Sequence, residues 1–200
     1  MSAPHLIRHY PLDLGSLEIE YMEQYFAEFT RPKSSGELRA RLESREHLIL
    51  ISLAPAPDDA SHWMPVAFKV AHELRAPERE PDPLIRDLAL RLAPCLDFRR
   101  RRVFYSWLGG TRREWRQQGH YRALTEQQEE WALRHGYQDF VVKTKNRYYG
   151  MRAALDHLHF DVIKFEPDAT DTANAKVYVH KRLSPETMQA HLTSRLVSHA

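Results

Sequence analysis

Short apolar runs rich in β-branched and aromatic residues alternate along this chain with segments of helical periodicity. The runs are of strand length, and the periodic segments between them are of helix length. Strands are predicted at His5–Tyr10, His47–Ala54, Met64–Leu74, Val103–Leu108, Asp139–Thr144, Phe160–Phe165 and Lys176–His180. Helices are predicted at Ile19–Phe29, Ser34–Leu42, Leu84–Leu92, Tyr121–His135, Asn146–His157 and residues 184–200. This order predicts an α/β or α+β chain built around a mixed sheet.

The composition is that of an ordinary globular chain. Of the 200 residues, 42% are hydrophobic and 28% are charged, which suits one domain with a core and argues against disorder. Apolar runs such as Leu48–Ile51 are much shorter than the roughly 20 residues that span a bilayer, so no membrane partner is expected. The single cysteine, Cys95, excludes an internal disulfide. Because the N-terminus also lacks a secretory pattern, we expect a cytoplasmic protein.

Positive charge is concentrated in one segment of the chain. Residues 1–100 carry 13 basic and 16 acidic side chains, whereas residues 101–200 carry 16 basic and 11 acidic ones. Eight arginines and a single acid, Glu114, lie between Arg99 and Arg122. Because guanidinium groups bind phosphate through paired hydrogen bonds, this segment predicts a polyanionic partner, either a phosphorylated cofactor or a nucleic acid. For Arg99–Arg102 alone, a solvated basic loop is an equal alternative.

The stretch from Phe104 to Leu124 combines a predicted strand, a glycine-containing loop and the start of a helix. The first N–H groups of a helix have no intrahelical acceptor, and the helix dipole is positive there. A loop with arginines before such a helix start is typical of a pyrophosphate site. The stretch contains neither the GxxxxGK[ST] pattern of nucleotide triphosphatases nor the GxGxxG of dinucleotide folds.

The tetrapeptide Arg116-Gln117-Gln118-Gly119 is similar to the (Q/R)xxGx(G/A) signature of the GCN5-related N-acetyltransferases. The order of elements over residues 103–166 also resembles the second half of that fold, and residues 5–74 agree with it in element order. The resemblance implies a mostly antiparallel central sheet flanked by helices, in a single acyltransferase domain over residues 1–183. A helical insertion over residues 75–102, between the third and fourth strands, and a C-terminal helix over residues 184–200 are expected within this plan.

The same resemblance implies an enzyme that moves an acetyl group from acetyl-coenzyme A to a primary amine by direct attack. Backbone amides from Arg116 to Tyr121 would hold the pyrophosphate, and arginine side chains would add charge. The strand end would pair with the pantetheine arm, where one N–H would polarise the thioester carbonyl. The cofactor-binding residues implied are Trp107, Leu108, Arg113, Arg116, Gln117, Gln118, Gly119, His120, Tyr121 and Asn146.

The sequence departs from the family pattern at three positions. Tyr121 replaces the expected glycine or alanine, and His159 replaces the glycine that usually precedes a phenylalanine. Leu155 occupies the place of the frequent tyrosine acid, which leaves Tyr148 or Tyr149 as substitute proton donors for the leaving thiolate. Packing at the helix start is the alternative role for both of these tyrosines.

A general base is needed because an ammonium acceptor must lose a proton before it attacks. Glu73 is the preferred candidate, because it ends the third predicted strand where the resembling subgroup tends to carry an acid. His72 is the second candidate, and a surface pair at a strand end is the alternative for both. His157 and His159 lack further ligands at metal-binding spacing, so no metal is predicted.

Two other functions remain open at this point. The first is a catalytically weak or inactive acyl-coenzyme A-binding module on the same fold, which Tyr121 and Leu155 would favour. The second is a nucleic-acid binder that uses Arg99–Arg122, although no nucleic-acid motif accompanies these arginines. The predicted partners are therefore acetyl-coenzyme A and an amine acceptor of open identity, with nucleic acid disfavoured and a homodimer left open.

Overall fold

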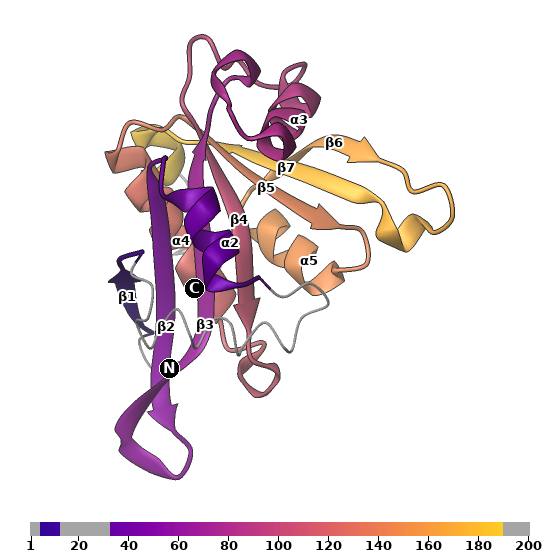
Figure 1. The fold of residues 1–200 in the computed structure, drawn as a ribbon. Helices are drawn as coiled ribbons and strands as arrows, with labels where there is room; N and C mark the ends of the chain where they lie inside the picture. Colours follow the sequence, from indigo (N-terminus) through magenta and orange to yellow (C-terminus); the bar gives the residue numbers. More distant parts are fainter. Residues whose placement is uncertain (1–4, 13–32, 190–200) are drawn as a thin grey trace. The chain divides into compact units, whose positions relative to one another are not determined.

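The computed structural model of the chain describes residues 5–12 and 33–189. Seven strands form a sheet in the order β1-β2-β3-β4-β5-β7-β6 (Figure 1). β4 pairs with β5 in parallel, whereas the β1–β2, β2–β3, β5–β7 and β6–β7 pairs are antiparallel. The predicted mixed, mostly antiparallel sheet is thus confirmed. The strands are β1 (Leu6–Tyr10), β2 (His47–Ala56), β3 (Asp59–Leu74), β4 (Val103–Thr111), β5 (Asp139–Lys145), β6 (Asp161–Glu166) and β7 (Lys176–Arg182).

Contacts within the chain divide it into two compact units. The first consists of Met1–His72 and Trp107–Gln128, and the second of Glu73–Ser106 and Glu129–Ala200. Strand β4 and helix α4 (His120–Arg134) run through both units. Each unit is described separately below.

The core of the first unit lies between helix α2 (Ser35–Leu42) and strands β2 and β3. The spacing of Ser34 and Glu37 predicts a capping box, and it is present: the Glu37 N–H donates to the Ser34 hydroxyl and the Ser34 N–H donates to the Glu37 carboxylate. The buried core side chains are Leu38, Leu42, Ile49, Ile51, Leu53, Phe68 and Val70. Alternation along the strands directs Phe68 and Val70 to this core and leaves Lys69 on the opposite face.

The connection between β2 and β3 is shorter than the sequence indicates. A loop was expected over Pro55–Trp63, because that stretch is rich in proline, aspartate and alanine. In the structure β2 continues to Ala56 and β3 begins at Asp59, so only two residues connect the strands. The strands tolerate prolines here because the register shifts between Ser52 and Leu53 and between Pro55 and Ala56.

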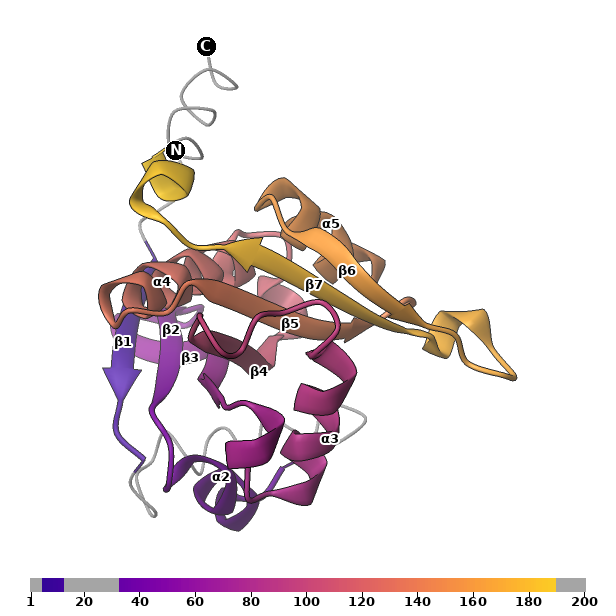
Figure 2. The same ribbon diagram turned by 90° about the horizontal axis from the view of Figure 1, so that it is seen from above.

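The second unit carries helices on both faces of its strands. Figure 2 shows α3 (Pro83–Leu92) and α5 (Tyr149–His157) on opposite sides of β5, β7 and β6. Asp82 caps α3 by accepting from the N–H groups of Leu84 and Ile85. A glycine shortly after a helical stretch predicts a helix stop, and α4 does end just before Gly136, which adopts φ 77° and lets the Tyr137 N–H reach the Ala132 carbonyl.

Several element boundaries differ from those expected. β4 runs through Gly109 and Gly110 to Thr111, although the two glycines were expected to end it. α5 begins at Tyr149 rather than Asn146. Short 3₁₀ turns follow β3 (η2, Pro77–Arg79), follow β4 (η3, Arg113–Trp115) and precede β7 (η4, Thr172–Asn174).

The two predicted terminal helices are described in part or not at all. The helix expected over Ile19–Phe29 lies outside the described residues. Residues 185–189 are helical, with the Thr187 N–H donating to the Ser184 hydroxyl, and the remainder of 184–200 lies outside the described residues. None of the helices in the described ranges has the length and hydropathy that crossing a bilayer requires.

Candidate functional site

The loop between β4 and α4 is fixed by hydrogen bonds within the first unit. The Arg112 N–H donates to the Val66 carbonyl (3.0 Å), and the Arg116 Nε donates to the Thr111 carbonyl (3.2 Å). Gln117 and Gly119 adopt positive φ angles of 64° and 86°. A positive φ is uncommon for residues other than glycine, so the conformation at Gln117 is maintained by the surrounding turn.

Three amide groups at the start of α4 have no hydrogen-bond acceptor within the described part of the chain. The first helical bond runs from the Ala123 N–H to the Gly119 carbonyl (3.0 Å). Among residues 5–12 and 33–189, no acceptor is found for the N–H groups of Gln118, Gly119 and His120. Three consecutive unsatisfied donors at the positive end of a 15-residue helix form an anion-binding arrangement.

Tyr121, the residue that departs from the family signature, packs inward. The Lys69 Nζ lies 4.5 Å from the centre of the Tyr121 ring, and the Tyr121 hydroxyl is buried. Lys69 is itself 1% exposed and donates to the Thr125 hydroxyl (2.7 Å), which in turn donates to the Tyr121 carbonyl (2.7 Å). Gly109 makes room, because a Cβ there would lie 3.1 Å from the Lys69 Cγ. The large side chain is thereby accommodated on the sheet side of α4.

His120 joins the loop to β2 and to the N-terminal segment. Its Nδ1 lies 2.9 Å from the Ser52 hydroxyl, and its ring centre lies 4.4 Å from that of His5. The ring is 4% exposed. Burial, and secondly the nearby His5, lower the pKa of His120 to about 4. His120 is therefore neutral at neutral pH.

This shift predicts that stability falls in mildly acidic solution. The unfolded chain binds a proton at this histidine near pH 6.5, whereas the folded chain resists protonation down to about pH 4. The free energy of unfolding should therefore be highest above pH 6.5 and fall by up to about 3 kcal/mol between pH 6.5 and pH 4. Denaturant titrations of His120→Asn should show a clearly smaller slope in that window.

The exposed His157→Asn variant is the control for this measurement, and its slope should match that of the unsubstituted protein. An unchanged slope in His120→Asn would show that another group produces the acid sensitivity.

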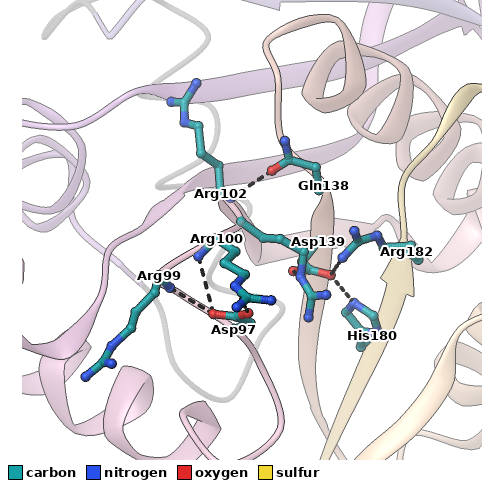
Figure 3. Close-up of polar contacts among 9 residues, drawn as sticks. Asp97, Arg99, Arg100, Arg102, Gln138, Asp139, His180 and Arg182 are labelled. Atoms are coloured by element: carbon teal, nitrogen blue, oxygen red, sulfur yellow. Dashed lines mark hydrogen bonds and ion pairs between the residues drawn. The ribbon is translucent and has the colours of Figure 1, made fainter.

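Much of the arginine run before β4 is engaged in hydrogen bonds and ion pairs inside the second unit (Figure 3). Asp139 is fully buried and accepts from Arg101 (2.7 Å), His180 (2.8 Å) and Arg182 (3.3 Å). Burial acts to raise the pKa of Asp139, but the His180 hydrogen bond and the cations lower it overall. Of the run, Arg101 is therefore held in a buried ion pair, whereas Arg113 and Arg116 lie in the loop after β4.

The other arginines of the run are held near the surface. The Asp97 carboxylate accepts from the N–H groups of Arg99 and Arg100 (Figure 3). Arg102 donates to the His135 carbonyl (2.8 Å) and to the Tyr137 hydroxyl (2.9 Å). These contacts favour the solvated, structural interpretation of Arg99–Arg102 over a nucleic-acid contact.

The two predicted general bases have different surroundings. His72 is fully buried on β3, and its ring contacts the Trp107 ring edge-on at 5.8 Å. Glu73 accepts from the Arg75 Nε (3.0 Å) and lies 3.7 Å from an Arg102 Nη. The structure thus brings His72 together with Trp107, one of the two strand residues predicted to face the pantetheine arm.

Asn146 contacts Arg152, which lines a pocket of the second unit together with Tyr149. The Asn146 amide donates to the Thr172 carbonyl (3.2 Å), and its oxygen accepts from the Arg152 guanidinium. Arg152 and Tyr149 line a pocket of about 320 Å³, together with Ala153, Leu155, Asp156, Phe160, Val162 and Val179. Tyr149 is 67% exposed at the first position of α5. Its hydroxyl is therefore accessible, as a proton donor must be.

Three side chains that contact α4 next to the loop were not identified from the sequence. Lys69, Ser52 and His5 each contact α4 or its first turn, from positions far away in the sequence. A lysine in the middle of an otherwise apolar strand was the available signal for Lys69. No local signal marks the other two. Among the described residues, no group of three metal-ligating side chains is found.

Comparison with known proteins identifies the fold but no close relative. No protein-family model matches the sequence, and no match was found among curated proteins. Arabidopsis thaliana NAA60 in complex with acetyl-CoA matches with a TM-score of 0.66 at 9% identity, over 89% of this chain and 99% of that chain. The NatC complex bound to Gag peptide and CoA matches with a TM-score of 0.63 at 14% identity, over 89% and 99%.

A third solved structure also matches. A GCN5-related N-acetyltransferase from Kribbella flavida gives a TM-score of 0.60 at 14% identity, over 90% of this chain and 98% of that chain. Each match thus covers about nine-tenths of this chain and nearly the whole of the matched chain. The chain has the fold of the GCN5-related N-acetyltransferases.

Proposed function

We propose that this protein is an N-acetyltransferase that moves an acetyl group from acetyl-coenzyme A to a primary amine. The observation that carries the proposal is the set of open amides at Gln118, Gly119 and His120, at the start of α4 in a chain with this fold. The residues present fit a diphosphate there, because the Tyr121 ring packs against Lys69 instead of filling the loop. The NAA60 structure contains acetyl-CoA and the NatC structure contains CoA, which supports the same ligand here.

Different groups of the chain would bind the cofactor and polarise its thioester carbonyl. The three amides would donate to the diphosphate, and the guanidinium groups of Arg113 and Arg116 would add charge. Backbone groups of Trp107 and Leu108 would pair with the pantetheine arm, where one N–H would stabilise negative charge on the carbonyl oxygen. Asn146 would contact the arm from the end of β5. Bound acetyl-coenzyme A would supply the acetyl thioester.

Proton transfers complete the proposed reaction. Glu73, with His72 as the alternative, would take the proton that the acceptor ammonium loses. Tyr149 would donate a proton to the departing thiolate, which leaves as the thiol. His72 has the support of its contact with Trp107, and Glu73 that of its place at the end of β3.

Two measurements together test the proposal. Calorimetry should show saturable binding of coenzyme A, and a panel of primary amines should release thiol from acetyl-coenzyme A in an amine-dependent manner. Binding without thiol release by any amine would instead support an acyl-coenzyme A-binding module. No binding at all would contradict both functions.

The assignment of the base predicts a specific kinetic defect. Glu73→Gln should lower kcat about 100-fold, because a positioned base contributes roughly that much or more, while the dissociation constant of coenzyme A stays unchanged. If Glu73→Gln keeps the kcat of the unsubstituted protein and His72→Gln loses it, then the base is His72.

A further inference from the structure

Four cations gather on one face of the second unit, around the carboxylate of Glu166. Lys143 lies opposite Tyr178 in the β5–β7 pair, and Tyr178 lies opposite Lys164 in the β6–β7 pair. Directly opposed residues share a face of the sheet. Thr144, the next residue in β5, donates to the Met151 sulfur of α5, so Lys143 points to the face that carries α3 (Figure 2). The group, named here the Lys143 cluster, consists of Arg91, Lys143, Lys164, Lys176, Glu166 and Tyr178.

Glu166 is the carboxylate that holds most of this cluster together. It accepts from the Arg91 Nη1 (3.2 Å), the Tyr178 hydroxyl (3.1 Å) and the Lys176 Nζ (3.5 Å). Lys164 lies 3.8 Å from the other carboxylate oxygen and donates to the Arg91 carbonyl (2.9 Å). Asp87 adds one further acid by pairing with Arg91 at 2.7 Å.

Lys143 is the cation that these acids leave without an ion pair. Within the described part of the chain no carboxylate lies within 4.0 Å of its Nζ, which lies 5.9 Å from the centre of the Tyr178 ring. The Lys143 side chain is exposed, yet the atoms around its ammonium group desolvate it, and this desolvation, and secondly the Lys176 charge, lower the pKa of Lys143. A protonated lysine held in these surroundings gains more from a bound anion than a fully hydrated lysine does.

We propose that the Lys143 cluster binds a carboxylate carried by the acceptor amine, so that the preferred substrates are anionic amines. The inference rests on the proposed acetyl transfer and adds the substrate class to it. Four cations against the carboxylates of Glu166 and Asp87 leave an excess of positive charge for that anion. Lys143 lies on β5 three residues before Asn146, which directly follows the strand, and three residues span about 10 Å along an extended chain.

That spacing suits a substrate whose carboxylate is a few bonds from its amine. Arg91 and Lys176 flank the anion position, and both are about two-fifths exposed, so a substrate can reach them. The buried Tyr178 ring forms the floor and excludes water from one side. An amine with a positive charge at the same place would be repelled by Lys143 and Lys176.

A matched set of peptides tests the proposal. Ala-Glu-Ala-amide, Ala-Gln-Ala-amide and Ala-Lys-Ala-amide offer the same amine with an acidic, neutral or basic neighbour. The unsubstituted protein should acetylate the glutamate peptide with a kcat/KM about tenfold above that for the glutamine peptide, and the lysine peptide should be the poorest. Lys143→Gln should remove the preference, and Lys143→Arg should retain most of it. Arg134→Gln, which removes the same charge from the exposed end of α4, should leave the preference intact.

Binding measurements separate this inference from the proposed function. Calorimetry with coenzyme A should give the same dissociation constant in all four proteins. Titration of the three peptides into the coenzyme A complex should reproduce the order of preference even without turnover. Equal binding and equal turnover of the glutamate and glutamine peptides, with coenzyme A binding intact, would overturn the anionic substrate class and leave the transferase. Selective glutamate-peptide binding without any acetylation would retain the anion site and contradict the transferase.

Discussion

Replacing Gly119 with glutamate should raise the dissociation constant of coenzyme A at least ~100-fold, which corresponds to 2.7 kcal/mol or more. A carboxylate at this position would lie beside the amides that are expected to receive the diphosphate, and like charges repel strongly at such short range. The backbone adds a second penalty, because Gly119 has φ 86° and a Cβ would lie 3.2 Å from the His5 Nε2. Isothermal titration calorimetry at fixed salt measures the effect.

Two control variants separate charge from strain in that experiment. Gly119→Lys imposes the same positive φ and the same contact with His5 but brings the opposite charge, so it should bind coenzyme A at least tenfold more tightly than Gly119→Glu. Gly36→Glu adds the same charge in α2, where the nearest atom to a new Cβ is the Ser34 hydroxyl at 3.8 Å, and should bind normally. Equal loss in the glutamate and lysine variants would show that the backbone conformation alone matters.

Lys181→Met should destabilise the protein by about 3–5 kcal/mol, the second large effect that we expect. The Lys181 Nζ lies 2.6 Å from the Glu129 carboxylate, and the two side chains are 2% and 1% exposed. Removing the cation leaves a carboxylate inside the second unit without its ion-pair partner. Chemical denaturation monitored by circular dichroism gives the free energy of unfolding.

A double variant tests whether the loss of stability comes from the Glu129 carboxylate that is left without Lys181. Lys181→Met with Glu129→Leu replaces both members by apolar groups and should be about 2 kcal/mol more stable than Lys181→Met alone. If the two variants are equally unstable, the loss is one of packing, for which the Lys181 contact with the Phe160 ring would be responsible.

The features that local sequence predicts well are those with a local cause. The capping box of Ser34 and Glu37 and the helix stop at Gly136 depend on residues within a few positions of each other, and both were found where expected. The loop expected over Pro55–Trp63 is a tight hairpin, because cross-strand pairing outweighed the low strand propensity of its prolines. Gly109 does not end β4. The glycine lies within the strand and leaves room for the Lys69 side chain, whose Cγ would lie 3.1 Å from a Cβ at this position.

The parts of the site that sequence reasoning did not give depend on distant partners. Whether Tyr121 blocks the loop depends on Lys69, which lies 52 positions earlier in the chain and contacts its ring. The neutrality of His120 depends on burial against β2 and on His5. The motif at Arg116–Gly119 located the loop, and only the folded chain shows that its amides are open.

The most direct test of the account is the response of the loop amides to coenzyme A in solution. In ¹⁵N-labelled protein, the amide resonances of Gln118, Gly119 and His120 should shift saturably on titration, and those of Gly119 and His120 should be among the largest shifts recorded. Pantetheine, which lacks the diphosphate, should leave these amide resonances unshifted. If these resonances do not move at saturating coenzyme A, the diphosphate does not bind at the start of α4 and the proposed acetyltransferase site is contradicted.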